Sequence, residues 1–404
     1  MADRGTAATA RSIRALFDLP RYVLVAVERW AGWGRLTLVP KTTRFRCPRC
    51  RSAGGDGQPG RRRLLRDLDI GRRHMEVRVQ VYRVWCRTCG RREVPITLAR
   101  RYARCTRRLE KHLFRLTGDS TVKAVAKRMA LDWDTVKDAE VRYIRGLLRK
   151  QNRDGITRIG LDEVSYEKGH KYLTLVTDLD GRRVIYATHG NDGRAVGRFL
   201  TWLGAQRCRR LKVVVTDMHD PYLKVLRKRL PKAALVFDHF HVSKLVHDAL
   251  DDIRRRLQRE LPPAGRRIIK GQRYVLLRAH EKLSRKQQVS LQEILDANTD
   301  LTKGYVLKEA FRDVFKATNL PEGRKRLRAW EAQVRESGVP ELLKVLDTIE
   351  RRRSGIENFF QYRVANGMAE GFNNVVGTIK KQAYGFHDRD YLRLKILRIC
   401  GKLE

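Results

Sequence analysis

Between residues 158 and 260 the chain alternates short apolar runs with segments of helical periodicity. Strand-like patterns cover residues 158–165, 171–179, 182–188, 211–216 and 233–237, and helical patterns cover 195–207, 222–230 and 242–260. The order is three strands, then three helices alternating with two further strands. Such an order is typical of an α/β layer, so we expect a mixed sheet covered by helices.

Acidic residues stand where two of these apolar runs close. Asp162 closes the first run and Asp217 follows the fourth, so both carboxylates emerge at one edge if the two strands are neighbours. Glu370 is a third acid, in a helical segment of small and polar residues that can approach a sheet closely. A buried acid is costly without a positive partner. The three acids therefore predict a catalytic site that holds two Mg²⁺ ions, for which Mn²⁺ can substitute.

Each acid also has a structural interpretation, because Asp at a strand end often forms a turn or caps a helix. The competing acids are Glu163, Asp178, Asp220 and Asp238, and sequence spacing excludes none of them. The segment that contains Asp238, His239 and His241 has two interpretations. In the functional one, the two histidines line the edge of the active site or bind phosphate; in the structural one, Asp238 caps a helix and the imidazoles pack.

The charge of the chain points to a polyanionic partner. Its 404 residues include 88 Lys and Arg against 45 Asp and Glu, a formal net charge of +43. Membranes are the other common polyanion, but no apolar run approaches the ~20 residues of a membrane span. The N-terminus lacks the apolar core of a signal peptide. We therefore expect a cytoplasmic protein that acts on nucleic acid, with a phosphodiester as substrate and no membrane partner.

Four of the seven cysteines form two Cys-x-x-Cys pairs, Cys47 with Cys50 and Cys86 with Cys89. An odd cysteine count in a chain without a leader argues against a disulfide framework. Paired thiolates on two turns can close a tetrahedral site, so we expect one structural Zn²⁺. The alternative is a set of buried thiols, and the presence of two pairs makes a redox role the weaker choice.

Residues 120–147 read as two helices separated by a short turn, with Ser120 as the N-cap of the first. This pattern favours a helix-turn-helix that binds DNA, although a helical hairpin with a solvated basic face has the same signature. The second helix would present Trp133, Thr135 and Lys137 to base edges. Phosphates would be contacted by Lys123, Lys127 and Arg128.

The remaining segments complete a multi-domain α+β chain. Strands are predicted over 22–28, 35–39 and 75–85, and helices over 11–19, 367–382 and 389–402. Residues 261–352 are helical and strongly charged, with a marked amphipathic helix over 301–315.

Taken together, these motifs resemble the ISL-three family of insertion-sequence transposases over nearly the whole chain. The matching segments are the two cysteine pairs, residues 120–147, Leu161–Glu163, Thr216–Met218, Asp238–His241, Gly304–Glu309, Asn366–Asn373 and Lys380–Phe386. The resemblance implies a DDE transposase with a ribonuclease-H-like catalytic domain. It assigns the catalytic triad to Asp162, Asp217 and Glu370, and it implies that the insertion before Glu370 is helical.

We therefore expect five parts. They are a zinc-binding domain (1–104), a helix-turn-helix domain (105–150), the first part of a ribonuclease-H-like catalytic domain (151–260), a helical insertion (261–352) and the C-terminal part of the catalytic domain (353–404). The function expected is binding of terminal inverted repeats and metal-dependent cleavage and transfer of DNA strands, by a homodimer on the DNA. The alternatives are a structure-selective nuclease on the same fold and a non-catalytic DNA-binding protein derived from a transposase.

Overall fold

The computed structural model describes residues 21–167, 169, 171–383, 386 and 388–403. Contacts divide the chain into two compact units, one extending through Gln151 and the other from Asn152 to Lys402. The helix predicted over residues 11–19 lies outside the described residues.

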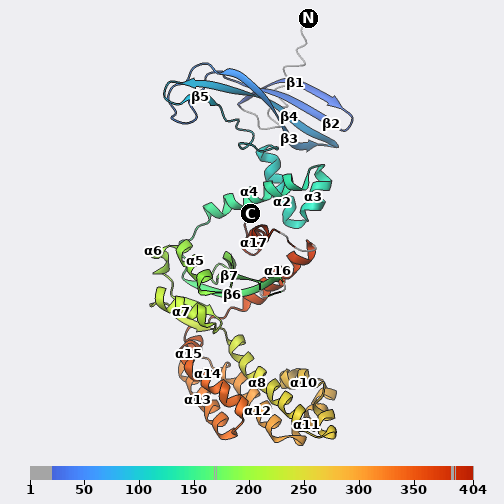
Figure 1. Cartoon of the computed structure of the whole chain (residues 1–404), viewed down its shortest axis with the longest axis vertical. Helices are drawn as coiled ribbons and strands as arrows, with labels where there is room; N and C mark the ends of the chain where they lie inside the picture. Colours follow the sequence, from blue (N-terminus) through green and yellow to red (C-terminus); the bar gives the residue numbers. More distant parts are fainter. Residues whose placement is uncertain (1–20, 168, 170, 384–385, 387, 404) are drawn as a thin grey trace. The chain divides into compact units, whose positions relative to one another are not determined.

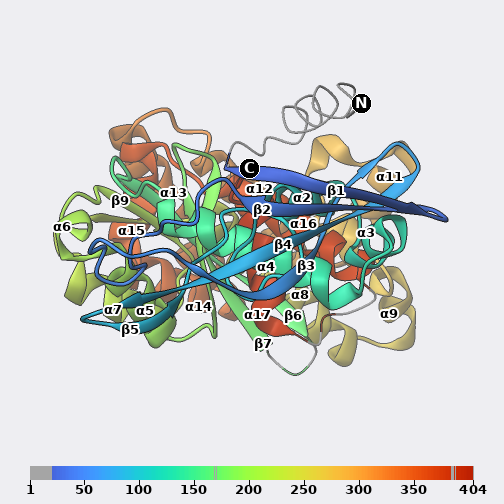
Figure 2. The ribbon, with the colours of Figure 1, turned by 90° about the horizontal axis from the view of Figure 1, so that it is seen from above.

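The N-terminal unit is built on a twisted sheet. Its strands are β1 (Tyr22–Trp30), β2 (Trp33–Pro40), β3 (Gln58–Ile70), β4 (Arg73–Cys86) and β5 (Gly90–Glu93). The order is β1-β2-β4-β3, with β5 paired to β4, and Figure 2 shows the long strands β3 and β4 side by side. The strands predicted over 22–28, 35–39 and 75–85 are confirmed as parts of β1, β2 and β4. Sequence reasoning missed β3, because its arginine and aspartate residues hide the alternation of apolar and polar positions. The strand is defined instead by its pairing with β4.

Three helices follow the sheet in the same unit. They are α2 (Arg107–Asp119), α3 (Val122–Met129) and α4 (Trp133–Lys150). The N-cap of α3 is Thr121, whose side chain accepts a hydrogen bond from the backbone of Ala124, whereas the predicted cap Ser120 instead ends α2. The observed N-cap lies one residue after the predicted one, because two hydroxyl residues stand together at this boundary. Ala130 adopts the left-handed conformation that turns the chain between α3 and α4.

Buried ion pairs anchor these helices to the sheet. Asp67 on β3 is 1% exposed and pairs with Arg108 on α2, while Glu110 on α2 is equally buried and pairs with Arg142 on α4. The carboxylates are buried while their arginine partners are partly exposed, so each pair satisfies a buried charge without burying both ions. These pairs therefore hold α2 to the sheet and α4 to α2.

The second unit contains the predicted mixed sheet. Its strands are β6 (Arg158–Glu167), β7 (Lys171–Asp178), β8 (Arg183–His189), β9 (Val213–Thr216) and β10 (Ala234–Phe237). The order is β10-β9-β6-β7-β8; β6, β7 and β8 pair antiparallel, and β9 runs parallel to both β6 and β10. The predicted order of strands and helices in this region is confirmed.

Helices cover this sheet. Successive side chains along a strand point to opposite faces and therefore enter different cores. Val214 on β9 shares a core with α5 (Gly193–Leu203) and α7 (Asp220–Arg229), beside the short helix α6 (Ala205–Cys208). Val213 and Val215 enter a second core with α8 (His239–Glu260) and α15 (Arg353–Tyr362). Two further helices, α16 (Gly367–Gln382) and α17 (Arg389–Ile399), contact β6 and β8 respectively.

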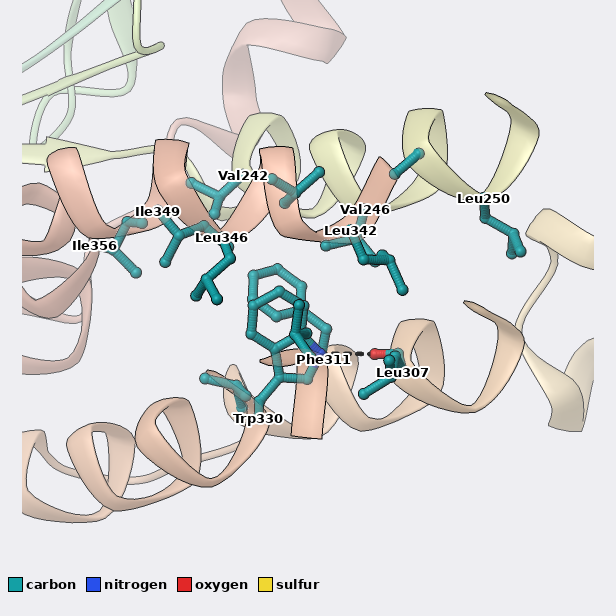
Figure 3. Close-up of a cluster of buried hydrophobic side chains, with 14 of the residues drawn as sticks. Val242, Val246, Leu250, Leu307, Phe311, Trp330, Leu342, Leu346, Ile349 and Ile356 are labelled. Carbon is teal, nitrogen blue, oxygen red and sulfur yellow. Dashed lines mark hydrogen bonds between the residues drawn. The ribbon is translucent and has the colours of Figure 1, made fainter. Parts of the chain in front are cut away.

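The segment between α8 and α15 is helical, as predicted; its described residues contain no strand. Its helices are α9 (Pro263–Ile269), α10 (Arg273–Leu277), the 3₁₀ turn His280–Lys282, α11 (Arg285–Ala297), α12 (Thr299–Val314), α13 (Leu320–Ser337) and α14 (Pro340–Arg351). Figure 3 shows their apolar core, where the rings of Phe311 on α12 and Trp330 on α13 have centroids 4.5 Å apart and face the side chains of α8 and α14. The Trp330 indole donates a hydrogen bond to the Leu307 carbonyl oxygen (2.9 Å), so its polar edge is satisfied although it is buried.

Across the part of the chain that the structure describes, every helix is too short or too polar to cross a membrane.

Candidate functional site

Asp162 and Asp217 lie on neighbouring strands of the second sheet. The parallel register between β6 and β9 pairs Ile159 with Val214 and Gly160 with Val215. Continued by two residues, this register places Asp162 level with Asp217. The sequence suggested that Asp162 ends its strand, but it does not. The hairpin with β7 extends β6 to Glu167 and pairs Asp162 with Leu175. Asp162 instead stands just beyond the part of β6 that pairs with β9.

One face of α16 packs against β6 at this point. The side chain of Asn373 donates to Oδ2 of Asp162 (2.9 Å), and that of Asn366 donates to the carbonyl oxygen of Leu161 (3.3 Å). A Cβ at position 160 would lie 2.4 Å from Oδ1 of Asn366, so glycine at this position lets the helix approach the strand. Asn366, Glu370 and Asn373 are spaced i, i+4 and i+7, which places Glu370 on the helix face that meets β6.

Glu370 lies in the first turn of α16 and is exposed. Among the described residues, the three carboxylates of Asp162, Asp217 and Glu370 are not gathered within metal-ligand distance of one another. The fold thus brings Asp162 beside Asp217 and sets Glu370 on the helix that contacts Asp162.

The electrostatics of Asp162 show which groups surround it. Burial raises the pKa of its carboxyl group, and the negative charge of Asp217 raises it further. The hydrogen bond from Asn373 and the positive charge of a protonated His241 act in the opposite direction. Oδ1 of Asn373 is buried without a hydrogen-bond partner. Two close carboxylates and a free amide oxygen form a hard donor set, which fits a divalent cation such as Mg²⁺.

Glu163 is the competing acid that stays close to this site. It follows Asp162 on β6 and therefore projects to the opposite face, where Asn191 donates to its Oε2 (3.1 Å). Burial raises the pKa of Glu163, and Asp217 also raises it. Its Oε1 is buried without a hydrogen-bond partner.

The other competing acids have structural roles. Asp178 accepts a hydrogen bond from the backbone of Gly181 (3.0 Å) in the turn after β7. Asp220 is exposed and pairs with Arg352. Asp238 caps α8 by accepting a hydrogen bond from the Phe240 backbone (3.2 Å).

The two histidines after Asp238 differ in their surroundings. The ring of His239 packs against Phe240, Phe315 and Phe359, at centroid distances of 4.1, 5.7 and 5.1 Å. His241 is exposed and acts electrostatically on Asp162. Of the segment that begins at Asp238, His241 is therefore the residue whose charge acts on Asp162.

The four paired cysteines of the N-terminal unit come together. The sulfur atoms of Cys47, Cys50, Cys86 and Cys89 all lie within 4.8 Å of one another. Four sulfurs bound to one zinc ion at about 2.3 Å lie roughly 3.8 Å apart, so the cluster fits a tetrahedral site. The Ser52 hydroxyl contacts Cys50 (3.1 Å) and Cys86 (3.4 Å), and it is the main reason that the pKa of Cys86 falls to about 6. The low pKa of Cys86 favours the thiolate that binds metal, whereas the hydrogen bond with Cys50 and burial raise the pKa of Cys89 to about 12.

The helix-turn-helix residues are placed unequally. Lys123, Lys127 and Arg128 on α3 are exposed. At the start of α4, Trp133 is 45% exposed and the Lys137 ammonium lies 5.0 Å from its ring centroid. Thr135 is only 8% exposed, because it lies on the face of α4 that packs inside the unit, so the structure does not present it to DNA.

Sequence reasoning did not assign the two asparagines that join α16 to β6. The signal was present in Asn366, Glu370 and Asn373, whose spacing defines one helix face. Only the contact with Asp162 shows that this face belongs to the site.

A helix-turn-helix in one unit and paired carboxylates on an α/β sheet in the other define a DNA-binding enzyme. Residues 94–144 match the helix-turn-helix domain of transposase family ISL3, and residues 159–396 match the transposase (DDE) domain of the same family. The chain belongs to the ISL3 family of insertion-sequence transposases.

Two similar proteins are named as transposases of insertion sequence elements. The transposase for insertion sequence element IS1001 of Bordetella parapertussis is 29% identical over 398 residues, which cover 94% of this chain and 98% of the relative. The transposase for insertion sequence element IS1557 of Mycobacterium tuberculosis is 30% identical over 382 residues, which cover 88% of this chain and 86% of the relative. The match therefore extends over both units.

Proposed function

We propose that this transposase binds the terminal inverted repeats of its element and cleaves and transfers DNA strands at Asp162, Asp217 and Glu370. The observation that carries the proposal is the register of β6 and β9, which sets Asp162 level with Asp217 under the helix that carries Glu370. The antiparallel strands β6–β8 followed by the parallel strands β9 and β10 support a ribonuclease-H-like catalytic domain. The helical segment from residue 261 to 352 is then an insertion in that domain.

In this proposal the three carboxylates hold two Mg²⁺ ions, which Mn²⁺ can replace. Bound there, the metal ions would make water or a 3′-hydroxyl nucleophilic and stabilise the leaving oxygen. Asn373 fixes the orientation of the Asp162 carboxylate, and the exposed position of Glu370 leaves the site open to DNA. His241 adds positive charge near the scissile phosphate when it is protonated.

DNA recognition is assigned to the N-terminal unit. Lys123, Lys127 and Arg128 contact phosphates from α3, while Trp133 and Lys137 reach base edges from the start of α4. Zinc held by the four cysteines fixes the strands and loop that precede these helices.

We expect Mg²⁺-dependent cutting and joining when purified protein meets labelled duplex that carries the terminal repeat. Mg²⁺ should yield a cut 3′ end and a joined product, and a chelator should abolish both. Ca²⁺ should preserve binding without turnover, because its looser and higher coordination fits in-line displacement poorly. Gel analysis of both products also separates two functions: cutting with no joined product in any Mg²⁺ or Mn²⁺ condition would indicate a nuclease.

The active species on DNA is proposed to be a symmetric homodimer. Transposition must bring two element ends together, and one active site serves one end at a time. Light scattering of the protein bound to repeat DNA should give the mass of two chains. A one-chain complex that still joins both ends would contradict this proposal.

A further inference from the structure

A cleft in the N-terminal unit, separate from α3 and α4, is lined by six arginines together with apolar residues. Its volume is about 730 Å³, and it lies among the Cys47–Cys50 turn, β3, β5 and the segment before α2. We name it the arginine cleft after Arg49, Arg61, Arg63, Arg91, Arg92 and Arg101, which line it. The one acid in its lining is Glu93.

The cations of the arginine cleft are incompletely neutralised by the protein. Arg61 pairs with Glu93 (3.2 Å), and Arg63 donates to the carbonyl oxygen of Ala103 (2.6 Å). Burial lowers the pKa of Arg63, and the nearby charge of Arg61 lowers it further. Nε of Arg92 is buried without a hydrogen-bond partner. Crowded guanidinium groups that the acids of the protein do not fully neutralise can receive an anion with several oxygens.

Tyr102 adds a flat aromatic surface to the lining of the same cleft. Its side chain is 74% exposed, and its ring lies 4.8 Å from the Arg101 guanidinium. Tyr102 adopts a φ of 63°, a left-handed conformation that is uncommon for a bulky residue and marks a position held by its surroundings. An exposed ring beside arginines is the arrangement on which nucleic-acid bases stack.

We propose that the arginine cleft binds a single DNA strand, with phosphates against the arginines and one base against Tyr102. This deepens the proposed function and rests on it, because DNA is taken as the polyanion. A concave surface with guanidinium groups around it can surround one backbone, and Tyr102 can stack on a base only where that base is unpaired. The helix-turn-helix, in contrast, is a convex surface suited to the groove of a duplex.

The test compares a single-stranded oligonucleotide with the duplex terminal repeat, using fluorescence anisotropy of the full-length protein. Arg92→Gln and Tyr102→Ala should each weaken single-strand binding roughly tenfold, whereas Tyr102→Phe should preserve it. The logarithm of the binding constant falls linearly with the logarithm of salt concentration. Arg92→Gln should make this slope shallower by about 0.7, the contribution of one phosphate contact on a single strand. Duplex binding should change less than twofold in all three variants.

Two matched variants act as controls. Arg29→Gln removes an exposed arginine from β1 in the same unit and should change neither affinity. Lys127→Ala on α3 should weaken duplex binding and leave single-strand binding unchanged, which tests the proposed function separately.

Unchanged single-strand binding in both Arg92→Gln and Tyr102→Ala would overturn the proposal. Equal losses on single strand and duplex would also overturn it, because the cleft would then belong to the duplex-binding surface. A wild-type protein that binds the single strand but shows no preference for the repeat duplex would instead contradict the proposed repeat recognition and leave the cleft assignment standing.

Discussion

Glu370→Gln abolishes cleavage of repeat DNA and leaves its binding intact, if Glu370 is the third metal ligand. The substitution preserves the size and hydrogen-bonding capacity of the side chain and removes the charge that holds a metal ion. Because Glu370 is exposed in the first turn of α16, the change should not disturb folding. We expect the cleavage rate with Mg²⁺ to fall by at least ~10³-fold, with a similar loss of strand transfer. The measurement is product formation in single turnover, beside binding measured in Ca²⁺.

Asp162→Ala and Asp217→Ala should have the same effect as Glu370→Gln. Both aspartates stand on one face of the sheet, and Asp162 is held by Asn373. Each alanine variant should retain binding to the repeat, because the assigned DNA contacts lie in the N-terminal unit. Loss of binding together with cleavage would assign these residues to folding or DNA binding instead.

Glu163→Gln is the matched control, since it changes the next residue on the same strand. Glu163 projects to the opposite face and accepts a hydrogen bond from Asn191, so substantial activity should remain. Asp220→Asn is a second control, which changes an exposed acid and breaks its ion pair with Arg352. Robust cutting by Glu370→Gln would contradict the triad and make Asp238 the next acid to test, although its carboxylate caps α8.

The sheet that carries the acids was predictable because its strands are buried. Apolar runs such as Val213–Val215 are recognisable in any context, and the helices between them show clear periodicity. The position of Asp162 within its strand was not predictable. The length of β6 depends on its hairpin with β7, and its partner β9 is more than forty residues away in sequence.

Other features depend on contacts that sequence patterns do not record. Thr135 follows the exposed residues Trp133 and Asp134, but the packing of α4 buries it. The arginine cleft combines residues from separate segments between Arg49 and Tyr102, and in the sequence these arginines look like an ordinary basic surface. The gathering of the four cysteines, in contrast, was predictable because each pair forms a turn with metal-ligand spacing.

Cys86→Ser is the second substitution for which we expect a large effect. Wild-type protein should contain about one zinc per chain, and the variant should lose it, because three sulfurs hold the ion far less tightly than four. The cluster ties the turn at Cys47–Cys50 to the end of β4, and Pro48 and Arg49 of that turn line the arginine cleft. Loss of zinc should therefore destabilise the N-terminal unit by several kcal/mol, on the order of a structural metal site, and weaken binding to repeat DNA.

Metal analysis of purified protein, thermal unfolding and DNA binding together measure this effect. Cys105→Ser is the matched control: Cys105 is buried in the same unit outside the cluster, and burial raises the pKa of its thiol to about 12. That variant should keep its zinc even if it unfolds at a somewhat lower temperature, because it removes a buried thiol and no ligand. Undiminished zinc in the Cys86→Ser protein would refute the four-cysteine site. Loss of zinc from both variants would mean that zinc binding depends on the folding of the N-terminal unit and does not identify Cys86 as a ligand.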